Sequence, residues 1–359
     1  MPAVKFKKIF TYAVFLLISY GLIDNLLGLA YEKLTGQPLV TDLSRSPHPI
    51  YHHGFAPLVS NSLSEFAGRI YRINTNSLGF KDLEARNVDL QSSKRRILII
   101  GDSFTEGIGL PFEKTFAGIF AAAAQKNNVE VLNAAVAGYS PTVYYYKLKY
   151  LLENVNLRFS EVMLFLDISD LQDERIYFFV KDDAVHTYTM DDTFNYFLNR
   201  ILKRILPVTY SAVKKIYPVK LMYKNEENYS KEYLNLERTS WTFDENVWQT
   251  TAQKSIPLVE SRLNDIAHLL KAAKVKLTLV VYPWKHQIIH GDLNSRQVTI
   301  WKPWAEKNGV DFINVFPDFI NGDESASTKY FLDGDVHWNE AGHELVAKRL
   351  INIYFPDNK

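Results

Sequence analysis

The chain of 359 residues contains no cysteine. It therefore has no disulfide bridge, no thiolate metal site and no cysteine nucleophile, although this leaves the redox compartment open. An excess of one charge is also lacking, because 41 Lys and Arg stand against 40 Asp and Glu, for a formal net charge of +1. A general nucleic-acid binder carries a basic stripe, so we expect no nucleic-acid partner. Hydrophobic residues make up 47% of the chain, enough for one large domain with appendages.

A long apolar segment opens the chain. Three lysines precede Ile9–Ile23, which is almost wholly apolar, and apolar residues resume after Asp24 and Asn25. A helix that crosses a bilayer needs about 20 apolar residues, which this segment reaches with the polar pair near one interface. The lysines favour an N-in orientation with the rest of the chain exported. We predict an uncleaved anchor over residues 1–35, with a signal peptide cleaved after Gly28-Leu29-Ala30 as the alternative.

Residues 36–95 are predicted to be an irregular, partly extended connection that glycine and several prolines interrupt. His52 and His53 invite a metal site, but adjacent side chains on an extended chain point to opposite sides. No further cluster with ligand spacing accompanies them, so we expect no metal. Alternation that begins at Tyr71 predicts one added strand beside the main domain.

From Arg95 onward, strand patterns alternate with helix patterns. The expected strands are Ile97–Ile100, Val129–Asn133, Val162–Asp167, Lys276–Tyr282 and Val310–Val315. The expected helices are Thr115–Gln125, Thr142–Leu152, Ser255–Ala273, Ser295–Lys307 and Asn339–Phe355. This alternation predicts an α/β fold, with a parallel sheet covered by helices on both faces and joined by right-handed crossovers.

The strand Ile97–Ile100 ends in Gly101-Asp102-Ser103-Phe104. Ser103 would lie at the carboxyl end of the strand, the edge at which open α/β sheets bind their ligands. Nearby backbone N–H groups can face a developing negative charge there. Ser103 is therefore a candidate nucleophile, although a serine at this junction can equally cap a turn or helix.

Near the other end of the chain stands Asp335-Val336-His337-Trp338-Asn339. A nucleophilic serine needs a base, and the base needs an orienting carboxylate. His337 can be the base and Asp335 can orient it, because side chains two residues apart on an extended segment point the same way. The alternative is an acidic loop that caps the final helix through Asn339, and both roles are compatible.

Together the two ends resemble the SGNH/GDSL hydrolase superfamily. Residues 101–104 match its first sequence block, and Asp335–Asn339 matches its last, in the Asp-x-His form of relatives such as the alginate O-acetyltransferases. Many esterases of the superfamily use Asp-x-x-His, but Gly334 occupies that aspartate position, which leaves Asp333 as a weaker candidate. The resemblance covers roughly residues 96–355. It implies a three-layer, flavodoxin-like fold and no cofactor.

The resemblance also implies an oxyanion hole. Its donors would be the backbone N–H groups of Ser103 and Gly138. The third block of the superfamily is normally Gly-x-Asn-Asp, but here the stretch Asp167–Asp170 places Ser169 where the asparagine donor should be. A hydroxyl can donate one hydrogen bond, so we expect Ser169 to join the hole. Loss of one such donor typically lowers the rate by about 10²–10³.

Between about residues 175 and 251 the rhythm breaks into an insertion rich in aromatic and basic residues, with a helix expected near Thr193–Ile205. Aromatic platforms suit sugar rings, which favours a glycan-binding lid. The alternatives are that these aromatics pack the insertion onto the main domain, or that the basic surface lies against anionic lipid heads.

We predict a serine-dependent ester hydrolase that acts on acyl, preferably acetyl, esters of an exported carbohydrate. Its catalytic domain, residues 96–357, would be periplasmic and tethered to the inner membrane. A polysaccharide O-acyltransferase shares the acyl-enzyme intermediate, so the sequence does not separate the two. A hypothesis from another class is a weakly catalytic, membrane-tethered glycan-binding protein. Ser169 favours that hypothesis, and the joint presence of Ser103, Asp335 and His337 opposes it.

Overall fold

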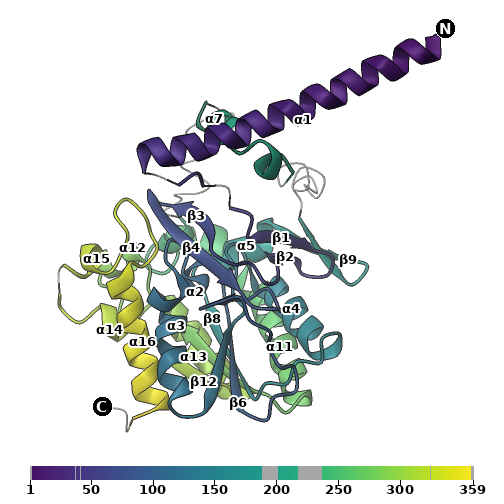
Figure 1. Ribbon diagram of the computed structural model, residues 1–359. Coiled ribbons are helices and arrows are strands. Elements are labelled where there is room, and N and C mark those ends of the chain that lie inside the picture. The colour runs from purple at the N-terminus through teal and green to yellow at the C-terminus, as the bar shows by residue number, and fades with distance from the viewer. Residues whose placement is uncertain are drawn as a thin grey trace. The chain divides into compact units, whose positions relative to one another are not determined.

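The structure, a computed structural model, describes residues 2–36, 38–40, 42–187, 201–216, 237–323 and 325–356. The chain divides into two compact units. The first unit comprises Met1–Leu43 and Asp192–Leu234, and the second comprises Ser44–Asp191 and Asn235–Lys359. Helices α1 and α7 belong to the first unit, whereas the sheets belong to the second (Figure 1).

In the first unit, helix α1 (Pro2–Thr35) contains the apolar segment predicted from the sequence. Over Lys8–Thr35 it is long and apolar enough to cross a membrane, with a mean hydropathy of 1.8. Most of its large apolar side chains are exposed within the unit. Helix α7 (Pro207–Ile216) packs along it (Figure 1).

The polar pair of α1 holds this second helix in place. Asp24 is only 3% exposed. Its carboxylate accepts hydrogen bonds from the backbone N–H groups of Val208 at 2.8 Å and Thr209 at 3.0 Å. Asn25 donates to the carbonyl oxygen of Ile205 at 2.9 Å. The first turn of a helix has backbone N–H groups without intrahelical acceptors, so Asp24 acts as a cap supplied by another helix.

The second unit is built around a sheet that, among the described residues, has eight strands in the order β12-β11-β8-β6-β7-β5-β4-β3. Its parallel part consists of β6 (Arg95–Ile100), β7 (Val129–Asn133), β8 (Glu161–Leu166), β11 (Lys276–Val281) and β12 (Asp311–Asn314). Numbered along the chain, these strands lie in the order 2-1-3-4-5, which is the flavodoxin-like order. The predicted fold class is confirmed.

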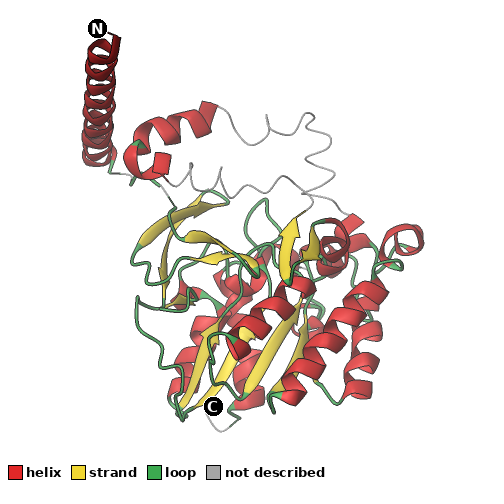
Figure 2. Ribbon diagram, turned by 90° about the vertical axis from the view of Figure 1, so that its right-hand side faces the viewer, coloured by secondary structure: helices red, strands yellow, loops and turns green. Residues whose placement is uncertain are grey.

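Helices cover both faces of this sheet (Figure 2). The main ones are α3 (Phe116–Gln125), α4 (Pro141–Glu153), α11 (Ile256–Ala272), α13 (Arg296–Asn308) and α16 (Glu340–Tyr354). Helix α16 packs on α3, and α11 packs on α4. Each begins and ends within one residue of its predicted position, because apolar periodicity and clear capping residues mark these segments. The central strand β6 is covered on both faces, because Ile97, Leu98, Ile99 and Ile100 are all fully buried.

The segment that precedes β6 is more structured than predicted. Strands β3 (Ser62–Phe66), β4 (Arg69–Thr75) and β5 (Lys81–Asp82) extend the main sheet in antiparallel fashion. Strands β1 (Arg45–His48) and β2 (His52–Phe55) form a separate hairpin. The second unit therefore begins at Ser44, whereas the sequence suggested a connecting segment over residues 36–95 with one added strand. Strands this short carry little periodicity of their own.

The predicted insertion over residues 175–251 is described only in part. After α5 (Asp170–Ile176), β9 (Phe178–Lys181) and β10 (Ala184–Thr187) form a hairpin, and α9 (Glu237–Ser240) and α10 (Glu245–Val247) follow later. Phe178 and Trp241 are buried, so these two aromatics pack the insertion onto the domain. The helix expected at Thr193–Ile205 lies outside the described residues up to residue 200, and 201–205 is helical. The predicted lid aromatics at positions 188, 194, 196, 197, 217, 223, 229 and 233 also lie outside them.

Candidate active site

The sequence forces a sharp turn at the end of β6. A Cβ atom at Gly101 would overlap the Thr105 hydroxyl, so only glycine fits there. Asp102 then caps the short helix α2 (Ser103–Glu106), its carboxylate accepting the Phe104 N–H at 3.0 Å. Ser103 is consequently the first residue of the helix and not its cap, and its hydroxyl is left for other contacts.

The structure brings the three predicted triad residues together. His337 Nε2 lies 2.8 Å from Ser103 Oγ, and His337 Nδ1 lies 2.6 Å from Asp335 Oδ1. Asp333 is exposed, and the carboxylate that contacts the histidine is that of Asp335. The arrangement matches a nucleophile, a base and an orienting carboxylate in hydrogen-bond contact.

The contact between Asp335 and His337 arises from a bend and not from the extended segment that we predicted. Asp335 Oδ1 accepts the backbone N–H of His337 at 2.9 Å, which is the bond of an Asx turn. The same oxygen faces the imidazole. Burial raises the pKa of Asp335, but the hydrogen bond and charge of His337 outweigh it, so the net shift is downward. The carboxylate therefore stays ionised beside the imidazole.

Contacts of residues on either side of His337 hold the loop that carries it. The N–H of Leu332 donates to the carbonyl oxygen of His337 at 2.9 Å. The Trp338 ring is fully buried, with its centroid 5.0 Å from the Phe104 ring in an edge-on contact. Asn339 caps α16, accepting the Gly342 N–H at 3.1 Å, as predicted. The loop thus both starts the last helix and presents the histidine.

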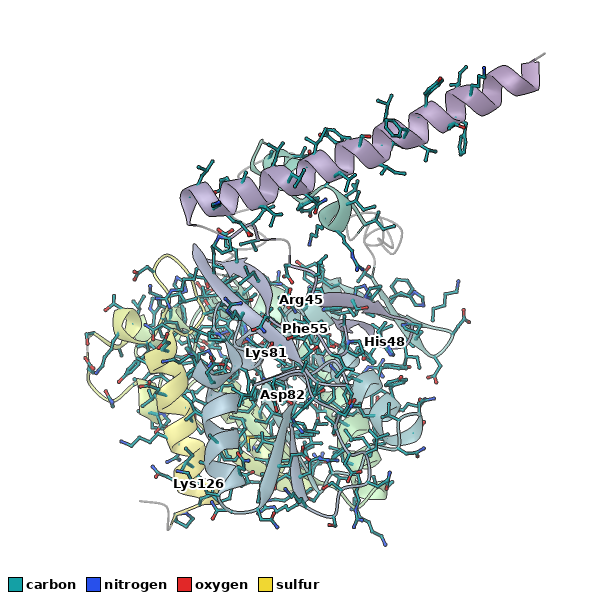
Figure 3. The ribbon with its side chains drawn as sticks, viewed as in Figure 1. Arg45, His48, Phe55, Lys81, Asp82 and Lys126 are labelled. Atoms are coloured by element: carbon teal, nitrogen blue, oxygen red, sulfur yellow. The ribbon has the colours of Figure 1, made fainter. Side chains whose placement is uncertain are left out.

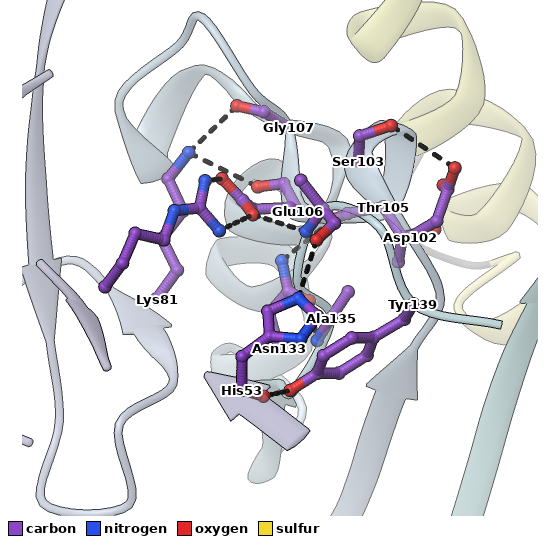
Figure 4. Close-up of polar contacts among 12 residues, drawn as sticks. His53, Lys81, Asp102, Ser103, Thr105, Glu106, Gly107, Asn133, Ala135 and Tyr139 are labelled. Carbon is purple, nitrogen blue, oxygen red and sulfur yellow. Dashed lines mark hydrogen bonds and ion pairs between the residues drawn. The ribbon is translucent and has the colours of Figure 1, made fainter. Parts of the chain in front are cut away.

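Ser103 has a second polar neighbour beside the histidine. Its hydroxyl lies 3.2 Å from Asp102 Oδ2 (Figure 4). Burial and the nearby charge of Asp167 raise the pKa of Asp102 well above its ordinary value. A protonated Asp102 is a weaker acceptor of the single hydroxyl hydrogen than a carboxylate, which favours the bond from Ser103 to His337.

The expected oxyanion loop follows β7. Gly138 has φ of +80°, a left-handed conformation that suits glycine. The neighbouring Ala137 is held at both its polar atoms: its N–H donates to Glu106 Oε2 at 2.7 Å, and its carbonyl oxygen lies 3.0 Å from His53 Nε2. In the part of the chain that the structure describes, the N–H groups of Ser103 and Gly138 have no hydrogen-bond acceptor.

Ser169 is placed differently from our expectation. Its hydroxyl donates to Asp167 Oδ1 at 2.6 Å, and its N–H donates to the same oxygen at 2.8 Å. The only hydroxyl hydrogen is therefore committed to a carboxylate and is not offered to an oxyanion. The physical reason is Asp167 itself, which occupies the glycine position of the third block. Asp167 Oδ2 also accepts hydrogen bonds from the Tyr282 hydroxyl at 2.8 Å and from the indole N–H of Trp284 at 2.7 Å.

Sequence reasoning missed the residues that support the site from outside. Glu106 is fully buried, and its carboxylate accepts hydrogen bonds from both terminal nitrogens of Arg45, at 2.6 and 2.7 Å. Arg45 also stacks over Phe55, with the guanidinium carbon 4.4 Å from the ring centroid (Figure 3). Phe66 packs edge-on to His337, with ring centroids 5.1 Å apart. No motif marks these residues, because the contacts exist only once the N-terminal strands have folded onto the sheet.

The pair His52–His53 was singled out in the sequence for the wrong reason. Their rings do meet, with the two Nδ1 atoms 2.7 Å apart, because His52 has φ of +71° and is not extended. Within the described residues no group of three or more His, Asp or Glu side chains is arranged to hold a metal ion. A single pair of nitrogens at this distance is a hydrogen bond.

Residues 236–355, about one third of the chain, match a family model described as the SGNH hydrolase-like domain of the acetyltransferase AlgX. No curated protein matches the chain significantly. Among solved structures, the chain is similar to the esterase EstA from Pseudoalteromonas sp., at 13% identity and a TM-score of 0.38 over 72% of this chain and 95% of that one. It is also similar to the acetylxylan esterase Axe2 from Geobacillus stearothermophilus, at 12% identity and a TM-score of 0.42 over 74% and 95%.

Proposed function

We propose that the chain is an SGNH/GDSL-type hydrolase that acts on ester bonds, as the match of its C-terminal third supports, and that Ser103 is its nucleophile. One observation carries the proposal: an unbroken hydrogen-bonded chain runs from Ser103 Oγ through His337 to Asp335, with contacts of 2.8 and 2.6 Å. Ser103 and His337 are 234 positions apart in the sequence. Binding of a ligand alone requires no such set.

In the proposed reaction, Ser103 Oγ attacks the ester carbonyl carbon while His337 Nε2 takes the hydroxyl proton. Asp335 accepts the Nδ1–H and stabilises the imidazolium. The backbone N–H groups of Ser103 and Gly138 stabilise the negative oxygen of the tetrahedral intermediate. The alcohol leaves with the proton from His337, and an acyl-Ser103 ester remains. His337 then deprotonates a water, whose attack releases the carboxylic acid and restores Ser103.

We propose an acetyl ester of an exported carbohydrate as the substrate. The matched family, described by an acetyltransferase, supports a small acyl group. The rings of Phe66 and Phe104 flank His337, with centroids 5.1 and 4.6 Å from its own. They give the histidine an apolar surround.

The second candidate is an O-acyltransferase, which the AlgX match favours directly. The acyl-enzyme would form in the same way, and a sugar hydroxyl would then replace water as the attacking group. His337 would take the proton of that hydroxyl. The product distinguishes the two: an acetylated acceptor from a transferase, and free acetate from a hydrolase.

We propose that the enzyme is tethered to the inner membrane by α1, with its catalytic domain in the periplasm. The apolar stretch Lys8–Thr35 supports a single crossing. The lysines at its amino-terminal end support the N-in orientation. This location would place Ser103 on the side of the membrane where exported polysaccharides occur.

The test is ester hydrolysis by the full chain in detergent. Wild type, Ser103→Ala and the control Ser93→Ala, which changes an exposed serine, are assayed with p-nitrophenyl acetate. We expect Ser103→Ala to lower turnover by several orders of magnitude and the control to match wild type. Equal rates in all three proteins would refute Ser103 as the nucleophile. Mass spectrometry of an oligosaccharide acceptor in the same mixture separates transfer from hydrolysis.

A further inference from the structure

The hairpin β1–β2 reaches the oxyanion loop with two side chains. Arg45 comes from β1 and His53 from β2, and the two strands are paired so that Arg45 faces Phe55 and Pro47 faces His53. Arg45 acts through Glu106, whose Oε2 accepts the Ala137 N–H. His53 contacts the Ala137 carbonyl directly. One local element thus fixes both polar atoms of a single residue next to Gly138.

The direction of the Gly138 N–H follows from this arrangement. The carbonyl of Ala137 and the N–H of Gly138 belong to one planar peptide unit, in which they point in opposite directions. A hydrogen bond that holds the carbonyl therefore also aims the N–H. The N–H on the other side of Ala137 is held by Glu106 at 2.7 Å, which opposes rotation of the preceding peptide.

The protonation of His53 is fixed by its partners. A carbonyl oxygen only accepts, so His53 Nε2 carries the hydrogen in the 3.0 Å contact with Ala137. His53 Nδ1 then accepts, and His52 Nδ1 is the donor in the 2.7 Å contact between the rings. The left-handed conformation of His52 makes that contact feasible. Burial lowers the pKa of His53 to about 3, so the neutral tautomer persists at ordinary pH.

Hydrogen bonds of Tyr139 and Lys147 hold the same loop at further points. The Tyr139 hydroxyl donates to the backbone carbonyl of His53 at 2.6 Å. Lys147 donates to the Tyr139 hydroxyl at 3.0 Å and to the Ala134 carbonyl at 2.7 Å. The loop is therefore held at Ala134, Ala137 and Tyr139, and Gly138 is the flexible residue between the last two. At a glycine, the orientation of the peptide depends strongly on such external contacts, because no side chain restricts it.

We propose that His53 is a positioning residue that sets the Gly138 N–H in the orientation needed to stabilise the oxyanion. The inference rests on the proposed acyl-transfer function. It assigns the N-terminal hairpin a part in catalysis, although no residue of the hairpin touches the reacting atoms. The role needs a hydrogen-bond donor at the place of Nε2, and it needs neither a charge nor a titrating group.

The test compares His53→Gln, His53→Leu and wild type as full chains with p-nitrophenyl acetate. The Gln side-chain amide can place a donor near the position of Nε2, whereas Leu keeps bulk without a donor. We expect His53→Leu to lower kcat by about 10²-fold, near the loss of one oxyanion donor, with KM changed by less than about twofold. His53→Gln should recover most of that loss. If His53 only stabilised the fold, His53→Gln would restore kcat no further than it restores the free energy of unfolding.

The matched control is Ser46→Ala in the same hairpin. The Ser46 hydroxyl makes an exposed contact with the carbonyl oxygen of Pro47 at 3.4 Å, so its removal leaves the hairpin intact. We expect wild-type kcat from this control. Wild-type kcat from His53→Leu, beside an inactive Ser103→Ala, would overturn the role of His53 and leave the proposed function standing.

A second experiment tests the position of the peptide directly and does not depend on turnover. Crystal structures of His53→Leu and His53→Gln are compared with wild type at the peptide between Ala137 and Gly138. We expect this peptide to be rotated in the Leu variant and retained in the Gln variant. The same peptide orientation in all three proteins would overturn the inference about His53, whether or not the enzyme turns over the ester. A failure of the wild type to turn over any ester would count against the proposed function instead.

Discussion

The contact between Asp335 and His337 permits a sharp prediction, because one carboxylate oxygen does two tasks. Oδ1 accepts both the imidazole Nδ1–H, at 2.6 Å, and the backbone N–H of His337, at 2.9 Å. In Asp335→Asn the amide oxygen can take the place of Oδ1 and keep both bonds. The tautomer of His337 is then preserved, and what is lost is the negative charge.

The magnitude follows from the distance. An imidazolium and a carboxylate with charge centres about 4 Å apart attract by about 4 kcal/mol at an effective dielectric constant of about 20. The Asp335 side chain is 25% exposed, and solvent screening reduces this to about 2–4 kcal/mol, or a factor of about 30 to 10³ in kcat. Asp335→Ala also loses the tautomer and the ring orientation, and we expect a loss of about 10⁴.

The assay is kcat on p-nitrophenyl acetate for both variants, with Asp333→Asn as the control because that carboxylate is exposed. The control should stay at the wild-type rate. Equal losses of about 10⁴ in the Asn and Ala variants would show that the amide turns and stabilises the wrong tautomer, which refutes the argument about the shared oxygen. Wild-type rates in both would remove Asp335 from the triad.

Three further outcomes follow from contacts outside the triad. Arg45→Met leaves the fully buried Glu106 carboxylate without its ion-pair partner, so urea unfolding should show a loss of about 3–5 kcal/mol, largely relieved when Glu106→Gln is added. Burial lowers the pKa of His343 to about 3. At this site the unfolded state therefore binds more protons below pH 6.5, so His343 should contribute a fall in unfolding free energy of about 1.4 kcal/mol per pH unit towards pH 3, and His343→Asn should reduce the measured slope by that amount. In a chain without cysteine, the pair Gly28→Cys and Val208→Cys should form a disulfide on mild oxidation, because a Cβ at Gly28 would lie 3.5 Å from the Val208 side chain. Failure of that cross-link would contradict the docking of α7 on α1.

The sheet and its main helices could be predicted because each is specified by its own residues. An unbroken apolar run such as Ile97–Ile100 is buried wherever it lies, and α11 has an apolar face that repeats at the helical period. The rule that parallel strands end at a common edge placed Ser103 at that edge, and the resemblance of the two end motifs to the SGNH/GDSL hydrolases paired Ser103 with His337. Neither step requires knowledge of a contact between distant side chains.

The parts that escaped prediction all depend on such contacts or on a local backbone choice. Glu106 has no motif of its own, and its partner Arg45 lies 61 positions earlier. The rings of His52 and His53 meet only because His52 has a left-handed backbone conformation, which residues other than glycine rarely adopt. Ser169 was expected to face the oxyanion because of its position in the motif, but the strong acceptor Asp167 takes its hydrogen. In each case a neighbour decided what the residue does.

The cap that Asp24 provides has a consequence for the biogenesis of the proposed membrane protein. The backbone groups that it binds are 184 and 185 positions later in the chain. At translation rates of about 5–20 residues per second, α1 waits roughly 10–40 s before α7 is synthesised. An uncapped aspartate costs about 2.5–3.5 kcal/mol at the centre of a bilayer helix. In the proposed membrane topology, Asp24 would therefore stay near the polar interface until α7 is synthesised, and the final depth of α1 would be set only after more than half of the chain has been made.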